Sequence, residues 1–321
     1  MYQFKQALID FYIKLGAIGY NFEKPTQWAS GTFNPFYVNN RLLQSVPEAR
    51  KAIGAGLASM IDNPDLIDYV YAVPSAGIAP ATLLALELNK PLIIKHDESY
   101  YSFNIDAVKE YVKSSLTPMM NDNDIVIGTV PFGIIFGLIA AELMGKPFLF
   151  IRDKPKGHGT KDQLEGIVKP GDYATLVDPM MNGVENYTLD AMRVIRDKGI
   201  EIPSVFDHPI DNFLHQKQLS DTNIIAVDDL SSTGESCLKE ITNLISIGAG
   251  VFPCSIFSYD LPSAVANFAK HGLVNQSLVN FKELMGEYRG EINLKDEMEI
   301  MKWYEDQPNW GDKNGFPRVI K

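Results

Sequence analysis

Two stretches of the chain follow the same pattern. Residues 71–94 read YAVPSAGIAPATLLALELNKPLII, and residues 127–150 read IGTVPFGIIFGLIAAELMGKPFLF. Each consists of an apolar strand, a turn with Val-Pro and glycine, a helix, a Lys-Pro pair and a second apolar strand. Apolar strands that alternate with helices are typical of a parallel sheet covered on both faces. The crossovers in such a sheet are expected to be right-handed.

A second pair of segments repeats in the same way. Residues 176–185 read LVDPMMNGVE, and residues 226–235 read AVDDLSSTGE. Each has an apolar strand, a Val-Asp pair and a loop that opens a helix. Along the chain, half of one copy is followed by a whole second copy and then by the rest of the first. We predict a duplicated α/β module with the second copy nested inside the first. Chance similarity of two βαβ units is the alternative.

Composition excludes several other classes of protein. The 321 residues suffice for two domains or one large domain, and 45% of them are apolar, which excludes general disorder. Lys and Arg number 29 against 40 Asp and Glu, and the net charge of −11 argues against nonspecific nucleic-acid binding. The 2 cysteines can form neither a disulfide framework nor a zinc site, and they favour a reducing compartment.

No segment has the pattern of a targeting or membrane signal. Residues 1–19 carry charges among apolar positions, which is typical of an amphipathic helix rather than a signal peptide. Residues 125–141 are uncharged, but they are short for a membrane span and are interrupted by glycine and proline. We therefore expect a cytoplasmic protein with neither a membrane nor a nucleic-acid partner.

The strongest chemical signal is the segment VDDLSSTGES at 227–236. An apolar strand is predicted to end at Asp228 and Asp229, and a hydroxyl-rich loop then opens a helix at about Ser236. Backbone N–H groups at a helix N-terminus bind phosphate, and Gly234 allows a close approach of the backbone. The two carboxylates can accept hydrogen bonds from ribose hydroxyls. The pattern indicates a sugar-phosphate site, and an ordinary capped strand end is the alternative.

This segment resembles the 5-phosphoribosyl-1-pyrophosphate (PRPP) signature of type I phosphoribosyltransferases. Other segments are similar to the orotate phosphoribosyltransferases of that family and occur in the family's order along the chain. Residues 28–41 resemble the base-covering hood, and residues 74–79 resemble the PRPP-site glycine loop. Residues 152–159 and 163–166 resemble the two parts of the catalytic dimer loop, and residues 256–261 resemble the C-terminal end.

The resemblance implies a fold and a division of the chain. The fold is α/β, with a type I phosphoribosyltransferase-like parallel sheet, helices on both faces, an internal duplication that forms a pseudo-dimer, and a small hood. Residues 1–61 would form the N-terminal helix and hood. Residues 62–104 with 216–321 would form the outer, PRPP-binding copy. Residues 105–215 would form the nested, degenerate copy that carries the flexible loop.

The resemblance also implies roles for individual residues. Residues at the catalytic centre are Arg152, Lys156, His158, Asp228 and Asp229. Residues that bind PRPP are the two acids together with Ser75, Ala76, Gly77, Ser231, Ser232, Thr233, Gly234, Glu235 and Ser236. Residues that bind the base are Ser30, Gly31, Phe36, Tyr37 and Arg41. The implied cofactor is Mg²⁺ bound through PRPP, with Asp228 as the one candidate protein ligand.

The two copies have complementary defects. In the nested copy, Pro179 and Met180–Met181 replace the second acid and the hydroxyls, and proline has no N–H to offer a phosphate. The outer copy lacks the Lys-Gly-His-Gly sequence after its strand at 92–94. We predict one composite site in a pseudo-dimer, with the phosphate loop from one copy and the flexible loop from the other. The alternative is that Lys156 and His158 belong to a solvated turn.

These expectations favour Mg²⁺-dependent phosphoribosyl transfer from PRPP to a nucleobase, with orotate favoured. The product would be orotidine 5′-monophosphate, an intermediate of pyrimidine biosynthesis. Transfer to another base and a PRPP-binding regulator without turnover are the alternatives. The sequence leaves open the base, the number of chains (a monomeric pseudo-dimer or a homodimer) and any ligand of the nested copy.

Overall fold

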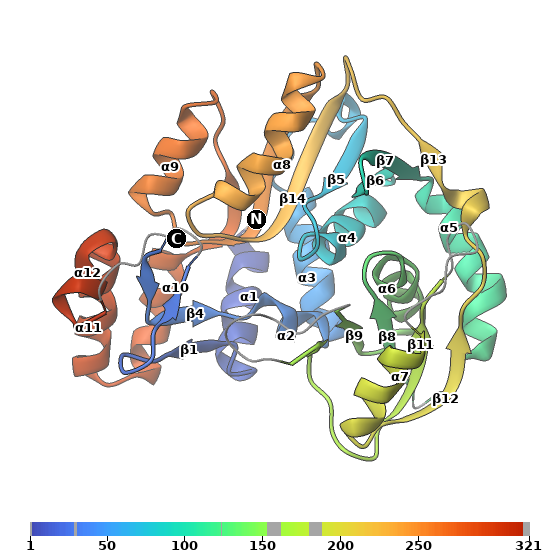
Figure 1. The fold of residues 1–321 in the computed structure, drawn as a ribbon, viewed down its shortest axis with the longest axis horizontal. Helices are drawn as coiled ribbons and strands as arrows, with labels where there is room; N and C mark the ends of the chain where they lie inside the picture. Colours follow the sequence, from blue (N-terminus) through green and yellow to red (C-terminus); the bar gives the residue numbers. More distant parts are fainter. Residues whose placement is uncertain (1, 29–30, 123, 153–161, 180–187, 317–321) are drawn as a thin grey trace.

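The computed structural model describes residues 2–28, 31–122, 124–152, 162–179 and 188–316, in which two sheets lie on either side of a layer of helices (Figure 1). The larger sheet has seven strands in the order β13-β7-β6-β5-β14-β15-β16. In chain order its strands are β5 (Tyr69–Ala72), β6 (Leu92–His96), β7 (Ser99–Phe103), β13 (His215–Gln216), β14 (Asn223–Ser231), β15 (Gly250–Ser258) and β16 (Gln276–Asn280).

The smaller sheet has five strands in the order β10-β9-β8-β11-β12. Its strands are β8 (Asp124–Thr129), β9 (Phe148–Ile151), β10 (Leu164–Glu165), β11 (Tyr173–Val177) and β12 (Glu201–Phe206). All of them come from the part of the chain predicted to form the nested copy. The division of the chain into copies stays a prediction.

Helices cover both faces of each sheet, which confirms the predicted α/β class with a mainly parallel sheet. The helices are α1 (Tyr2–Lys14), α2 (Asn40–Gln44), α3 (Pro47–Ala58), α4 (Ile78–Leu88), α5 (Ile105–Tyr111), α6 (Phe132–Met144), α7 (Thr188–Asp197), α8 (Glu235–Ser246), α9 (Pro262–Ala269), α10 (Phe281–Tyr288), α11 (Leu294–Glu305) and α12 (Gln307–Lys313). The uncharged stretch at 125–141 forms β8 and most of α6, both buried. In the described part of the chain, no helix combines the length and apolar character that crossing a membrane requires.

The two sheets share one strand order. Five neighbouring strands of the larger sheet, β7-β6-β5-β14-β15, match β10-β9-β8-β11-β12 of the smaller one. In both sets the first strand is antiparallel to the second and all later neighbours are parallel. A Cβ on Gly77 would lie 2.1 Å from the Val227 oxygen, and a Cβ on Gly133 would lie 2.1 Å from the Val177 oxygen. These matches favour the predicted duplication over chance similarity.

One apolar core lies between the sheets. Helices α4 and α6 pack against each other there, and their buried side chains belong to the same cluster as Val227 of the larger sheet and Val126 of the smaller one. Two further clusters lie on the outer faces, one beneath α8 and one beneath α7. Because α4 belongs to the larger-sheet module and α6 to the smaller-sheet module, their packing fixes how the two modules face each other.

The hood consists of two short ribbons that dock on the C-terminal helices. The ribbons pair β1 (Ile18–Tyr20) with β4 (Phe36–Val38) and β2 (Thr26–Gln27) with β3 (Phe33–Asn34). The Trp303 indole N–H donates to the Phe33 carbonyl at 2.9 Å, and the Tyr259 hydroxyl donates to the Phe36 carbonyl at 3.1 Å. Trp303 and Trp310 are buried, so both hold the C-terminal helices in place.

Arg50 joins the N-terminal region to the nested module from within the core. Its side chain is 0% exposed, and its Nε lies 2.5 Å from Glu142 of α6. The same guanidinium donates to the carbonyls of Gln44 and Lys146. Arg50 thus binds the Gln44 carbonyl of the N-terminal region, and it also binds the Glu142 carboxylate and the Lys146 carbonyl of the nested module.

We expect Arg50→Ala to lower the free energy of unfolding by about 3–5 kcal/mol, because it leaves Glu142 and two carbonyls without their shared partner. Urea unfolding followed by circular dichroism measures the change. The exposed neighbour Lys51 provides the control, and Lys51→Ala should stay within about 0.5 kcal/mol of the wild type. Equal unfolding midpoints for the two variants would contradict a stabilising role for Arg50.

Candidate active site

The acid pair lies inside strand β14 rather than at its end. The sequence predicted that the strand stops at Asp229, but β14 continues to Ser231, which pairs with Ser258 of β15. Asp228 is only 8% exposed, and its Oδ1 accepts the Asp229 N–H at 2.8 Å. Burial, followed by the charge of Asp229, raises the pKa of Asp228 well above its usual value. Asp228 therefore holds its proton more tightly than an ordinary aspartate.

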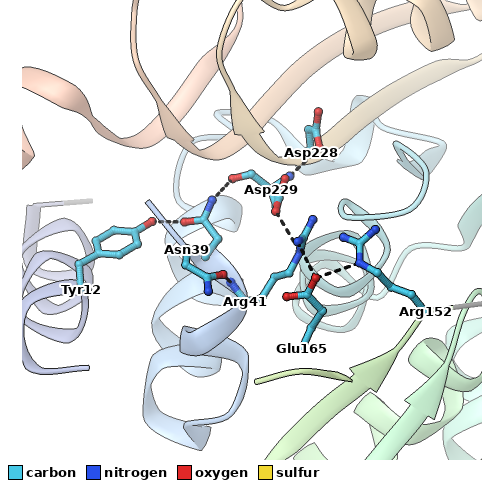
Figure 2. A network of polar contacts seen from close by, with 8 residues as sticks. Tyr12, Asn39, Arg41, Arg152, Glu165, Asp228 and Asp229 are labelled. Carbon is cyan, nitrogen blue, oxygen red and sulfur yellow. Dashed lines mark hydrogen bonds and ion pairs between the residues drawn. The ribbon is translucent and has the colours of Figure 1, made fainter. Parts of the chain in front are cut away.

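Asp229 is anchored to the N-terminal segments. Its carbonyl accepts from the Asn40 Nδ2 at 2.6 Å, and the Asn40 Oδ1 accepts from the buried Tyr12 hydroxyl at 2.5 Å. Helix α2 begins where Asn39 caps it by accepting the Arg41 N–H (Figure 2). Helices α1 and α2 are thus tied to the strand that carries the acids.

The Asp229 carboxylate is linked to the nested module through a chain of charges. Figure 2 shows Arg41 between Asp229 and Glu165, with Arg152 on the other side of Glu165. The Arg41 Nε lies 3.9 Å from the Asp229 Oδ2. The Glu165 Oε1 lies 2.9 Å from the Arg41 NH1 and 2.9 Å from the Arg152 Nε. Residues of both modules therefore meet at the acid pair.

The phosphate-loop prediction needs one correction, at Ser231. Its side chain is buried, and its hydroxyl oxygen has no hydrogen-bond partner within the described part of the chain. It lines a 90 Å³ cavity beneath α9 and is the last residue of strand β14 rather than part of the loop that follows the strand. The loop is confined to Ser232, Thr233 and Gly234, and α8 begins at Glu235, one residue earlier than predicted.

The described loop turns at a glycine in the left-handed region of the backbone. Gly234 has a φ of +77°, which favours glycine, and a Cβ there would lie 2.6 Å from the Phe268 ring. The Asn267 amide donates to the Thr233 carbonyl and holds the loop against α9. The Glu235 and Ser236 side chains are exposed at the start of α8, so the Glu235 carboxylate points into solvent.

The second predicted PRPP loop lies beside the acid strand. The Val73 N–H donates to the Val227 carbonyl, directly before the acids, and Gly77 packs against the same carbonyl. Ser75 and Ala76 are half-buried at the start of α4. The Ser75–Gly77 loop follows strand β5, and the acid pair lies on the neighbouring strand β14. Both are therefore at the carboxyl end of these parallel strands.

The predicted base-binding residues have different surroundings. Phe36 is fully buried against Tyr259 and Phe281, so its ring packs in the interior of the hood. Tyr37 is 50% exposed, and Arg41 lies next to Asp229. Gly31 is buried with a φ of +79°, and Ser30 lies outside the described residues.

The flexible-loop residues Lys156 and His158 also lie outside the described residues. The two ends of that segment are described and lie together. The Arg152 N–H donates to the Gln163 carbonyl at 3.0 Å, and the Gln163 amide donates to the Arg152 carbonyl at 3.1 Å. Through Arg152 and Glu165, these ends contact Arg41 of the N-terminal region.

In the nested copy, the position that matches Asp228 is Asp178. Its carboxylate accepts from the hydroxyls of Thr129 at 2.5 Å and Thr188 at 2.7 Å. Burial raises the pKa of Asp178, and the two threonine hydrogen bonds oppose that shift. The cavity at this edge, lined by Thr129 and Arg152 among others, has a volume of about 10 Å³. That is room for about one water molecule rather than a sugar phosphate.

Sequence reasoning missed three residues of this network, namely Tyr12, Asn40 and Glu165. Tyr12 gave no recognisable signal, and Asn40 was noted only as part of the hood-like segment 28–41, because the partners of both lie far away along the chain. Glu165 did give a signal. It is an acid in the segment that resembles the catalytic dimer loop, where the resemblance also places the cations Arg152 and Lys156.

Comparison with known proteins agrees with the motifs. A curated orotate phosphoribosyltransferase of Streptococcus gordonii is 26% identical over 303 residues, covering 93% of this chain and 94% of the relative. That of Streptococcus pneumoniae serotype 19F is 26% identical over 301 residues, covering 93% of each chain. Among solved structures, Leishmania donovani UMP synthase is 15% identical to this chain, with a TM-score of 0.49. The match covers 94% of this chain and 42% of the synthase. No protein-family model matches the sequence.

The curated matches confirm the predicted resemblance: the chain is a relative of the phosphoribosyltransferases, a class of group-transfer enzymes. Within that class, the relatives that match it along its length are orotate phosphoribosyltransferases.

The raised pKa of Asp228 predicts a pH-dependent stability change. A carboxyl group whose pKa is higher in the folded than in the unfolded protein favours folding below its unfolded pKa of about 3.9. That contribution is lost as the pH rises through the folded pKa. Asp228→Asn removes the cost of a buried charge, so its melting temperature should exceed that of the wild type at pH 7.

Calorimetric melting between pH 4 and pH 8 measures this effect. The gain from Asp228→Asn should be smallest near pH 4, and each kcal/mol gained corresponds to roughly 2–4 °C. Asp62 is exposed and provides the matched control, since Asp62→Asn should show no such trend. A gain that is the same at every pH would contradict the raised pKa as its cause.

Proposed function

We propose that this chain transfers the phosphoribosyl group of PRPP to orotate, forming orotidine 5′-monophosphate and pyrophosphate. The curated relatives support this choice of base. They are named orotate phosphoribosyltransferase, and this chain matches them over almost their whole length. The prediction of a cytoplasmic location is compatible with this role.

The observation that carries the proposal is the polar chain between the two modules. Asp229 comes from the seven-stranded sheet, Glu165 lies in the five-stranded sheet and Arg152 directly follows one of its strands, yet Arg41 joins them (Figure 2). A sugar-phosphate site needs carboxylates for ribose and cations for the leaving pyrophosphate. One chain supplies both sets at one place, which supports a composite site within a pseudo-dimer.

The residues divide the chemistry as follows. A ring nitrogen of the base attacks the anomeric carbon of PRPP, and the bond from that carbon to the pyrophosphate oxygen breaks. Asp228 and Asp229 hold the ribose hydroxyls and favour the cationic ribose of the transition state. The positive charge of Arg152 and of Lys156, with His158 as proton donor, stabilises the departing oxygens. The 5-phosphate binds the N–H groups of residues 232–236 at the start of α8.

Mg²⁺ fits this donor set when the substrate supplies most of its ligands. Within the described residues, no group of three or more His, Cys, Asp and Glu could hold a metal ion. The protein carboxylates nearest the predicted ribose position are Asp228 and Asp229. The ion would bind PRPP oxygens with one of these acids and would neutralise charge on the pyrophosphate.

A screen of bases with PRPP and Mg²⁺, followed as pyrophosphate release, tests the proposal. Orotate should give the highest kcat/KM. Release with a different base would identify another phosphoribosyltransferase. PRPP binding in calorimetry without release for any base would identify a regulator instead.

Replacing both acids should abolish turnover and leave the fold intact. Asp228→Asn with Asp229→Asn keeps the size of both side chains but removes the charges that favour the cationic ribose. Pyrophosphate release and the circular dichroism spectrum measure the two properties. Retained activity in the folded double variant would overturn the assignment of the ribose site.

Lys156→Ala should lower kcat by about 10²–10³-fold and change PRPP affinity less, because its charge is needed most as pyrophosphate departs. The control is Lys169→Ala, an exposed lysine of the same module, which should keep the wild-type kcat. A Lys156→Ala variant that retains the kcat of the control would remove Lys156 from the catalytic centre.

A further inference from the structure

A single buried carboxylate holds two arginines from different parts of the chain. The Glu165 Oε1 accepts from the Arg41 NH1 and from the Arg152 Nε, each at 2.9 Å. The side chains of Glu165, Arg41 and Arg152 are 7%, 16% and 18% exposed. Ion pairs this well shielded are screened less by salt than surface pairs, so their geometry is more strongly maintained.

Glu165 lies on a fixed part of the nested module. Strand β10 pairs with β9, with Glu165 opposite Phe150 and Leu164 opposite Ile151. Immediately after β10, the Ile167 N–H donates to the Ser45 hydroxyl oxygen at 2.9 Å. The carboxylate is therefore held by backbone pairing on one side and by the N-terminal region on the other.

The two arginines depend on Glu165 in different ways. Arg41 extends from the short helix α2, and its guanidinium carbon lies 6.0 Å from the centre of the Phe150 ring. Arg152 is the last described residue before the segment that carries Lys156 and His158. Two guanidinium groups this close repel each other, and the carboxylate between them offsets that repulsion.

We propose that Glu165 is the positioning residue of the composite site. It sets the guanidinium of Arg152 toward the departing pyrophosphate and that of Arg41 toward Asp229 and the base. The cations are then in place before pyrophosphate leaves, and no rearrangement is needed in the transition state. This inference rests on the proposed function, because it assumes that PRPP binds at Asp228 and Asp229.

The joint between the modules does not depend on Glu165. The packing of α4 on α6, the ion pair of Arg50 with Glu142 and the hydrogen bond from Ile167 to Ser45 all join them elsewhere. A variant of Glu165 is therefore expected to lose arginine placement before it loses the fold.

Glu165→Gln is the direct test, because glutamine keeps the shape and removes the charge. We expect kcat to fall on the order of 10–100-fold, the usual effect of losing a partner that orients a functional group. The KM for PRPP should change less, since the arginines act mainly on the transition state. The matched control is Glu201→Gln, an exposed acid of the same module, which should keep both constants.

A double-mutant cycle separates positioning from a purely structural role. Arg152→Ala should lower kcat strongly in the wild type but much less in the Glu165→Gln background, because Arg152 is already misplaced there. Glu165→Asp keeps the charge on a shorter stem and should give an intermediate kcat. If Glu165→Gln fails to fold, the kcat of Glu165→Asp carries the test.

The outcomes separate this inference from the proposed function. If the wild-type chain releases no pyrophosphate, the proposed function fails and the positioning role fails with it. If the wild type is active and Glu165→Gln keeps its kcat, only the positioning role is overturned. Independent, additive losses from Glu165→Gln and Arg152→Ala would also overturn it.

Discussion

The packing of α4 on α6 is the constraint on which the rest of the structure depends. Both helices are almost wholly apolar and are buried in the core between the two sheets. A glycine at the start of each helix, Gly77 before α4 and Gly133 in the first turn of α6, leaves no room for a side chain beside a strand carbonyl. The helix pair therefore fixes the position of one sheet relative to the other, and with it the distance between Asp229 and Arg152.

Charge placement follows from that apolar framework. The chain from Arg152 through Glu165 and Arg41 to Asp229 alternates in sign across the module boundary. An alternating chain of this kind stabilises partly buried charges that would be unfavourable alone. Asp228, which lies deepest, instead has a raised pKa because of its burial. The site therefore offers one shielded acid next to a paired acid and two paired arginines.

The predicted nested copy differs from the outer copy at the edge that would match the acid pair. In the nested copy, the Asp178 carboxylate accepts hydrogen bonds from Thr129 and Thr188. Its contribution is the hairpin that presents Arg152 and Glu165 to the other copy. Under the predicted duplication, a contact between subunits has become a contact within one chain.

The sequence by itself determined the α/β class and located the two pairs of similar segments, the acid pair and the hydroxyl-rich loop, because strand periodicity and short motifs depend on neighbours in the chain. Only the tertiary structure decided that Ser231 and Phe36 are buried, since strand β14 continues past the acids and the hood packs on Tyr259. The tertiary structure also showed that Tyr12, Asn40 and Glu165 belong to the polar network around the acid pair. Their partners lie from 13 to 189 residues away along the chain, and no local pattern encodes such distances.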